Sequence, residues 1–137
     1  MSDNLTPEQR KRNMSRIRSI HTEPEIIVRS LIHRLGFRFR LHVRHLPGKP
    51  DVVFPSHKKV VFVHGCFWHM HSCKYGQVVP KTNTDYWNAK RLGNVRRDKM
   101  HISSLKKQGW KVLVLWECYT RKRSPHLIRR LEKFLNQ

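Results

Sequence analysis

The sequence predicts one α/β domain, in which a mixed central β-sheet is flanked by helices on its faces. Four apolar stretches have the length and composition of strands, at residues 37–43, 52–54, 60–63 and 111–116. Segments with helical periodicity precede, separate and follow them, as expected for a sheet covered by helices. The chain has 137 residues, the length of a single domain, and 38% of them are apolar, so it can bury a core.

The first 20 residues are predicted to form a basic helical arm, ahead of a core over residues 21–137. Thr6 and Pro7 are typical of a helix start, and the helix would run to about Ser19. Arg and Lys dominate this segment and large apolar residues are scarce, so it packs weakly by itself. We expect an arm that becomes ordered on a binding partner, and a solvated charged helix is the alternative.

A second helix is predicted between Thr22 and Gly36. Its apolar residues recur at helical spacing, and a glycine is typical of a helix stop. Thr22 and Glu25 have the Thr-x-x-Glu spacing of a capping box, which by itself accounts for Glu25. Because Glu25 is one of only nine acidic residues, a second interpretation is that it orients a histidine or helps to hold a metal ion.

The rest of the chain alternates strands, turns and helices. Apolar residues alternate from Phe37 to Val43, which predicts a half-buried strand, and residues 65–82 lack a clear period. The other predicted elements are a turn at 46–50, a strand at 52–54, a hairpin turn at 55–58, a buried strand at 60–63, a helix from about Thr84 through Gln108 with a break near Gly93 as an alternative, a buried strand at 111–116 and an amphipathic helix at 125–135.

The charge balance indicates a polyanionic partner. The chain has 29 Lys and Arg residues against 9 Asp and Glu, a formal net charge of +20. Such a charge repels itself unless a polyanion neutralises it, and nucleic acid does so with release of counterions. A membrane surface and a merely soluble basic protein are the alternatives. We expect a cytoplasmic protein, because no secretory segment or long apolar run stands out.

All three cysteines of the chain belong to one predicted metal site. Cys66 and Cys73 lie in the segment GCFWHMHSC together with His71, and Cys118 follows the last predicted strand. These four residues form a Cys₃His set, which binds Zn²⁺ in closed structural sites. An odd number of cysteines argues against a disulfide framework. The alternatives are His69 in place of His71 as the ligand, or three reduced cysteines in the core.

One carboxylate and two imidazoles are predicted at the same edge of the sheet. Asp51 opens one strand and His64 ends the next, so a hairpin brings them together, and the following loop holds His69. Phosphodiester hydrolysis needs a cation, a base for water and help for the leaving oxygen. A carboxylate that holds Mg²⁺ and two histidines can supply all three. The alternatives are a turn residue for Asp51 and a satisfied core histidine for His64.

Large aromatic side chains occupy the same loop. Phe67 and Trp68 lie between the predicted metal ligands, and Trp87 stands with Tyr86 at the start of the next helical segment. Such side chains either pack against the sheet or insert between base steps of DNA, and the basic composition favours insertion. Unstacking costs least at a mismatch, so an aromatic wedge gives a physical route to mismatch preference.

These segments resemble the Vsr family of very short patch repair endonucleases. The resemblance runs from about residue 6 to residue 120. It implies a fold similar to restriction endonucleases of the PD-(D/E)xK class. It also implies a strand-specific, Mg²⁺-dependent nick 5′ of the T in T·G mismatches, which arise by deamination of 5-methylcytosine, as the start of repair. The matching segments are residues 46–51 (LPGKPD), 63–69 (VHGCFWH), His71 with Cys73, 116–118 (WEC), 12–14 (RNM), Asn94-Val95 and Arg97-Asp98.

The resemblance also implies roles for individual residues. Asp51 would hold Mg²⁺, His64 and His69 would assist the chemistry, and Glu25 matches a family acid near the site. The remaining implied residues are Cys66, His71, Cys73 and Cys118 as zinc ligands, and Phe67, Trp68 and Trp87 as intercalating aromatics. From the basic composition of the arm, we expect Arg12 and Arg16 to bind DNA.

This chain departs from related nucleases at the second acid and the lysine, where it has Phe62 and His64. We therefore expect the backbone carbonyl of Val63 to be the second Mg²⁺ ligand. We favour His69, from the loop, as general base and His64 as the aid to the leaving group.

The expected partner is double-stranded DNA with a T·G mismatch, bound by a monomer in a bacterial, nucleoid-associated setting. Contacts to mismatch-repair proteins are also expected, and no membrane is. A zinc-stabilised DNA-binding module without catalysis is the main alternative, but it leaves Asp51, His64 and His69 unexplained. An RNA-binding or ribosome-associated protein is the third candidate, because charge and aromatic residues allow it.

Overall fold

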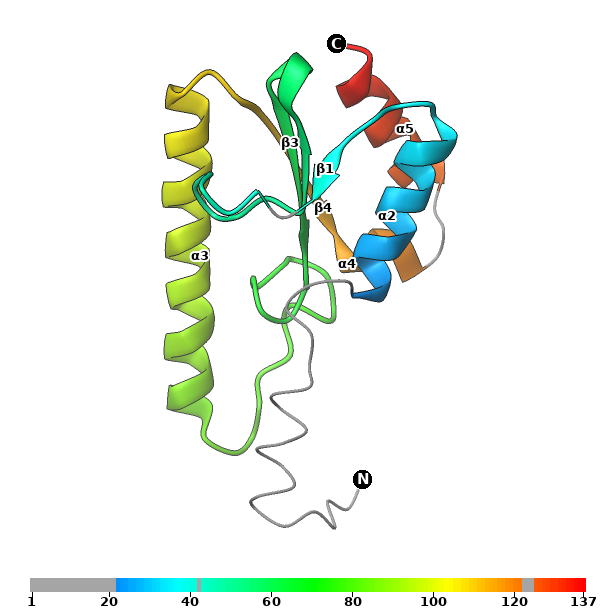
Figure 1. The fold of residues 1–137 in the computed structure, drawn as a ribbon. Coiled ribbons are helices and arrows are strands. Elements are labelled where there is room, and N and C mark those ends of the chain that lie inside the picture. Colours follow the sequence, from blue (N-terminus) through cyan, green and yellow to red (C-terminus); the bar gives the residue numbers. More distant parts are fainter. Residues whose placement is uncertain (1–21, 42, 122–124) are drawn as a thin grey trace, which may run out of the picture.

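The computed structural model describes residues 22–41, 43–121 and 125–137. Helix α3 (Thr84–Lys107) covers one face of a β-sheet, and helices α2 (Glu23–Arg34) and α5 (Pro125–Leu135) cover the other (Figure 1). A short helix, α4 (Glu117–Arg121), directly follows the last strand. The predicted α/β domain, a mixed sheet with helices on its faces, is confirmed.

The sheet has four strands in the order β1 (Arg40–Leu41), β2 (Val52–Phe54), β3 (Lys59–His64) and β4 (Lys111–Trp116). The first three are antiparallel neighbours, whereas β3 and β4 run parallel with His64 opposite Trp116. The β2–β3 hairpin pairs Val53 with Val60, so the start of β2 and the end of β3 lie at the same edge. The candidate functional site lies at this edge.

Alternation along the strands separates the core into two layers. Val52, Phe54 and Val61 face the α2 and α5 side and are at most 1% exposed. Val53 and Val60 face the α3 side, with Leu105 of α3 among the residues of that layer. Helix α5 closes the first layer with an apolar stripe at helical spacing, Leu127, Leu131, Phe134 and Leu135.

Several predicted boundaries differ from those in the structure. The strand predicted at residues 37–43 is reduced to Arg40–Leu41, although Phe37 and Phe39 still pack against the core. Helix α3 continues through Gly93 without a break, since one glycine costs a helix only about 1 kcal/mol. The hairpin turn is a 3₁₀ turn, Pro55–His57, closed by Lys58 at φ 54°. Helix α4 was not predicted.

The capping box predicted at the start of α2 is wrong. Thr22 occupies the N-cap position, but its side chain makes no capping hydrogen bond. Glu25 is 4% exposed and binds Arg29 at 2.8 Å, so it points into the protein. The predicted basic arm, with Arg12 and Arg16, lies outside the described residues. In the part of the chain that the structure describes, no helix is long and apolar enough to cross a membrane.

Candidate active site and metal centre

A cleft of about 1100 Å³ opens at the edge where the β2–β3 hairpin ends. It is lined by the four residues that the sequence singled out for catalysis, which come from α2, the position just before β2, the end of β3 and the following loop. Val63 and the two aromatic residues of that loop line it as well. The structure therefore brings together Glu25, Asp51, His64 and His69.

Asp51 and Glu25 form a pair of neighbouring carboxyl groups in this cleft. The backbone N–H of Val63 donates a hydrogen bond to Asp51 Oδ2 at 2.6 Å, which fixes the carboxyl against the end of β3. Burial, together with the nearby Glu25 carboxyl, raises the pKa of Asp51 to about 7, although the Val63 hydrogen bond opposes the rise. Two desolvated carboxyl groups side by side are suited to a hard cation, which would relieve their repulsion.

His64 and His69 lie face to face beside a carboxylate that the sequence analysis did not assign. Their rings are stacked with centroids 4.0 Å apart and planes 5° apart. Asp98 of α3 lies 2.5 Å from His69 Nδ1 through Oδ2, and its Oδ1 lies 4.0 Å from His64 Nε2. These three residues form a second group whose ligand atoms lie within 4.8 Å of one another. Burial lowers the pKa of His64 to about 4, so this ring is neutral near pH 7.

Cys66, His71, Cys73 and Cys118 converge on one point. Their ligand atoms all lie within 4.8 Å of one another, and His71 Nδ1 is 3.5 Å from Cys118 Sγ. Three sulfurs and one imidazole this close together are a donor set that Zn²⁺ prefers, so these residues fit a zinc ion. The cluster contains His71, whereas His69 lies beside Asp98 in the other group.

The thiols need a cation to be held together as thiolates. Burial raises the pKa of Cys66 to about 12, and it also raises the pKa of Cys118. Cys73 is desolvated too, but backbone N–H groups of Gly76 and Tyr75 contribute to an overall lowering of its pKa. A metal ion would offset the repulsion among three thiolates, as it does in structural zinc sites.

Trp116, at the end of β4, lies between the Cys₃His cluster and the two histidines of the cleft. Its ring stacks on His71 with centroids 4.1 Å apart and planes 14° apart. The same ring also makes edge-on contacts with the rings of His64 and His69, with centroids 5.3 and 6.5 Å apart. Displacement of His71 would therefore also disturb the stacked rings of His64 and His69, through Trp116.

The aromatic residues form one cluster beside the cleft. Phe67 and Trp68 have ring centroids 5.3 Å apart, and both contact Trp87 of α3, at 6.1 and 5.6 Å. Lys90 places its ammonium group 5.5 Å from the Trp68 ring and 5.9 Å from that of Trp87. Tyr86 extends the cluster and is 58% exposed. The rings of Phe67, Trp68 and Trp87 are thus partly buried, and Tyr86 is exposed beside them.

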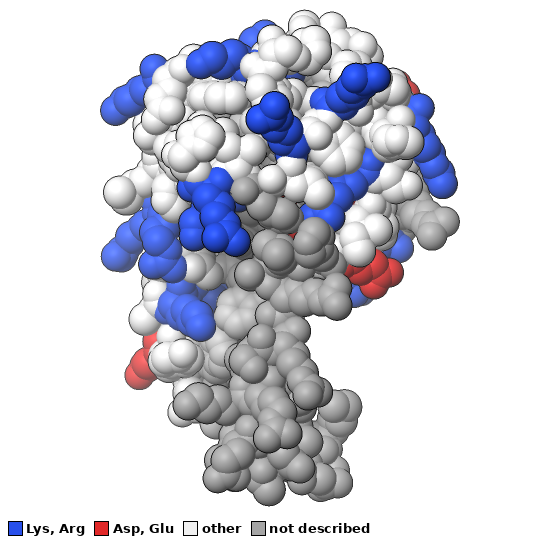
Figure 2. Space-filling model, in the orientation of Figure 1, with Lys and Arg blue, Asp and Glu red and all other residues white. Residues whose placement is uncertain are grey.

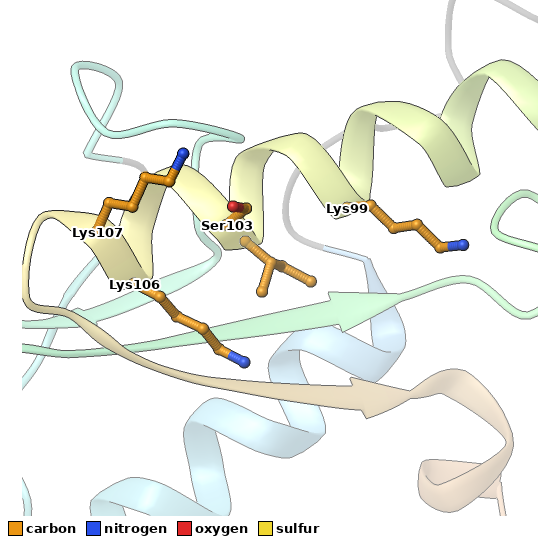
Figure 3. Close-up of a pocket in the computed structure, with 5 residues that line it drawn as sticks. Lys99, Ser103, Lys106 and Lys107 are labelled. Atoms are coloured by element: carbon orange, nitrogen blue, oxygen red, sulfur yellow. The ribbon is translucent and has the colours of Figure 1, made fainter.

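Basic side chains are numerous on the surface of the molecule. Lys and Arg are spread over the face shown in Figure 2, where acidic side chains are sparse. A second hollow, of about 580 Å³, runs along α3 and is lined by Lys99, Ile102, Ser103, Lys106 and Lys107 (Figure 3). Because Ile102 also lines the cleft, the two hollows adjoin. The second hollow has no acid or imidazole in its lining, so it is positively charged but lacks the carboxylates and histidines of the cleft.

Two residues near the site were missed by the sequence analysis as functional candidates. Asp98 was quoted only within the resemblance, and Arg91 not at all. Both lie on α3, where an acidic or basic residue normally indicates a solvated helix face. The only available signal was the rarity of acidic residues in a chain that has nine of them.

Known proteins are similar to this sequence over most of its length. Residues 2–75 match the family described as DNA mismatch endonuclease Vsr. The chain is 52% identical to the type II nicking enzyme V.XorIIP of Xanthomonas oryzae pv. oryzae, over 86% of each protein. It is 45% identical to the type II nicking enzyme V.NmeAIP of Neisseria meningitidis, over 86% of this chain and 84% of that protein. It is 40% identical to the DNA mismatch endonuclease Vsr of Escherichia coli, over 98% of this chain and 88% of that protein. The chain therefore belongs to the Vsr family of DNA mismatch endonucleases.

Proposed function

We propose that this protein is a Mg²⁺-dependent endonuclease that nicks double-stranded DNA on the 5′ side of the T in a T·G mismatch. Mismatches of this kind arise by deamination of 5-methylcytosine, and the nick would initiate very short patch repair. The observation that carries the proposal is the cleft in which Asp51 with Glu25 lies beside His69 with Asp98. We infer a fold similar to the PD-(D/E)xK class and a single domain of residues 1–137, including the arm at residues 1–20.

Asp51 is the residue best placed to hold Mg²⁺, with Glu25 beside it and the Val63 carbonyl as the expected second ligand from β3. When bound, the ion would neutralise charge that develops on the scissile phosphate. Asp51 is held in place by the Val63 N–H at 2.6 Å, and Glu25 is held by Arg29 at 2.8 Å. Both carboxylates are therefore oriented before any ligand arrives, which reduces the ordering cost of binding.

His69 is the general base of the proposed reaction. A neutral His69 that donates its Nδ1 proton to Asp98 leaves Nε2 as an acceptor for a proton from water. The water oxygen then bonds to phosphorus as the P–O bond to the leaving sugar oxygen breaks. Asp98 stabilises the imidazolium formed, because the two groups are 2.5 Å apart.

His64 aids the leaving group by a hydrogen bond from its neutral ring. It is 7% exposed and packed between His69 and Trp116, so it has little freedom to move or to be solvated as a cation. A neutral imidazole N–H can still stabilise negative charge on the leaving oxygen. That oxygen takes up a proton from water once the bond has broken.

Recognition of the mismatch is proposed to depend on the aromatic cluster. Phe67, Trp68 and Trp87 stand beside the cleft and can insert where base stacking is already weakened. The Cys₃His cluster, with Zn²⁺ as the proposed ion, would keep this loop in place. Surrounding cations, including Arg12 and Arg16 of the arm, would bind the phosphate backbone without reading sequence.

The proposed partner is the mismatched duplex, bound by a monomer in the bacterial cytoplasm at the nucleoid. Contacts to mismatch-repair proteins are also part of the proposal. The decisive experiment compares two end-labelled duplexes that differ only by one T·G pair, with wild type and Asp51→Asn, each with and without Mg²⁺. We expect nicking only by the wild type, only with Mg²⁺ and only of the mismatched duplex. Tight binding without cleavage by the wild type, over several sequence contexts, would instead favour a DNA-binding module.

A further inference from the structure

Helix α3 holds the backbone of the loop that carries the aromatic cluster. Arg91 Nε donates a hydrogen bond to the Phe67 carbonyl at 2.7 Å, and Asn94 Nδ2 donates one to the Trp68 carbonyl at 3.0 Å. These two helix residues are three positions apart and so lie on one face of α3. The same face thus fixes two consecutive aromatic residues by their main chain, independently of their rings.

The same helix face holds the next residue of the loop. Asp98, four positions after Asn94, binds His69 at 2.5 Å. The loop residues 67–69 are therefore each tied to α3 by a separate side chain. Since α3 is a continuous helix of 24 residues, the spacing between the aromatic residues and His69 is set by a rigid element.

Arg91 is buried in an unusual way. It is 1% exposed, and its guanidinium also donates to the carbonyls of Val78, at 2.8 Å, and Gly76. Its Cζ atom lies 4.3 Å from the centre of the Phe67 ring. Among the described residues, no carboxylate lies within ion-pair distance of it. A buried charge is costly without a partner, so these carbonyls are what hold the guanidinium there.

The carbonyls that Arg91 contacts lie on both sides of the metal-binding segment. Phe67 follows Cys66 directly, whereas Gly76 and Val78 come after Cys73. One guanidinium therefore clamps the entry and the exit of the loop onto α3, a geometry that its planar fork of five donors allows and a lysine cannot reproduce. Metal ligands fix the loop near β4, and Arg91 fixes it at the opposite side.

We propose that Arg91, together with Asn94, is a positioning residue for mismatch recognition: it sets the depth at which Phe67 and Trp68 enter the duplex and thereby the approach of His69 to the phosphate. This inference rests on the proposed function. It adds that aromatic insertion and DNA cleavage both depend on the contacts between the loop and α3. The two activities should therefore weaken together when these contacts are removed.

The test compares Arg91→Met, Arg91→Lys and Arg96→Met in the full-length, zinc-loaded protein. Arg96 is exposed on the same helix, so its substitution removes the same charge without the buried contacts. Three quantities are measured: amide hydrogen exchange of residues 66–78, fluorescence of 2-aminopurine next to a T·G pair as a signal of unstacking, and single-turnover nicking with the Kd for the duplex. Zinc content and Tm are recorded for each variant.

For Arg91→Met we expect faster exchange in residues 66–78, loss of most of the 2-aminopurine signal and a nicking rate lower by about 10- to 100-fold, since small misplacements cost this much. The Kd should change no more than it does in Arg96→Met. Arg91→Lys should lie between wild type and Arg91→Met. The proposal is overturned if Arg91→Met matches Arg96→Met in exchange, unstacking and nicking.

Two other outcomes are possible: failure of the Arg91→Met variant to fold or to keep zinc, and failure of the wild type to nick T·G duplexes. If Arg91→Met does not fold or loses zinc, Asn94→Ala replaces it, because that change removes only the Trp68 contact and a short contact from Arg97. A lower rate and weaker unstacking with zinc retained then support the proposal, and wild-type values refute it. If the wild type does not nick T·G duplexes, the proposed function fails, but exchange and 2-aminopurine fluorescence still decide whether Arg91 positions the loop on bound DNA.

Discussion

His69 Nδ1 and Asp98 Oδ2 are 2.5 Å apart, although they come from a loop and from a helix 29 residues further along the chain. This contact leaves one nitrogen of His69 as a proton acceptor and gives the charged ring a carboxylate partner. The same carboxylate lies 4.0 Å from His64, so a single acid faces both histidines of the cleft. Its position makes Asp98 as important to the proposed chemistry as the histidines themselves.

Replacement of Asp98 by asparagine should lower the single-turnover nicking rate by about 10²- to 10⁴-fold, because His69 loses the group that orients it and stabilises its imidazolium form. Affinity for mismatched DNA should change little. Asp85→Asn is the matched control, since Asp85 is exposed in the first turn of the same helix. A rate equal to that of the wild type would remove Asp98 from the mechanism.

The two loop histidines, His69 and His71, should have different functions. His71→Ala should release zinc and lower Tm, by roughly 10 °C or more, because structural zinc contributes directly to folding. It should also slow nicking through the stack of His71 on Trp116. His69→Ala should retain one zinc per chain and lose nicking. Zinc analysis and thermal unfolding of both variants check this, and zinc lost from His69→Ala instead would exchange the two assignments.

Asp51 should make the stability of the protein depend on pH. Its pKa is raised from an ordinary value of 3.8 to about 7, so between these values the folded protein binds more protons than the unfolded chain. The free energy of unfolding therefore falls as the pH rises from about 4 to about 7. Asp51→Asn removes this pH dependence of the free energy of unfolding. Without Mg²⁺ the variant should therefore be more stable than the wild type at pH 8, with a Tm higher by about a few degrees, as expected for the loss of one buried charge.

The corresponding measurement is the Tm difference between variant and wild type at pH 5 and at pH 8. Taking the difference removes effects that both proteins share, such as protonation of the cysteine cluster. A Tm difference that is the same at both pH values would contradict a buried Asp51 with a raised pKa.

Two glycine substitutions should have opposite effects. A Cβ at Gly76 would overlap the His71 backbone, its carbonyl oxygen above all, so Gly76→Ala must displace the loop that carries the Cys₃His cluster and should weaken zinc retention. At Gly93, within α3, a Cβ would meet only the Arg97 side chain at 3.5 Å or more. Gly93→Ala should stabilise the protein by about 0.5–1 kcal/mol. Urea unfolding with zinc analysis distinguishes them, and equal stability of the two variants would contradict the close approach at Gly76.

The parts of the site that depend on local geometry could be predicted from the sequence. Asp51 and His64 are joined by a hairpin, whose register alone brings the start of one strand to the end of the next. Cys66, His71 and Cys73 are close in the sequence. Contacts made by α3 could not be predicted, because they depend on how a 24-residue helix packs across the loop.

Glu25 shows how a local pattern can mislead. Its spacing from Thr22 is that of a capping box, but burial beside Asp51 and the ion pair with Arg29 determine its orientation instead. Arg91 shows the opposite case, since a basic residue in a charged helix gives no sign of being buried. In both cases tertiary packing overrides the local preference of the sequence.

Mapping the cut on a T·G duplex labelled separately at each strand is the measurement that tests the central claim most directly. The account predicts one nick, on the T strand and immediately 5′ of the mismatched T, in wild type with Mg²⁺, and none in the T·A duplex. Cleavage of both strands, or equal cleavage of the T·A duplex, would contradict mismatch-directed nicking by this site.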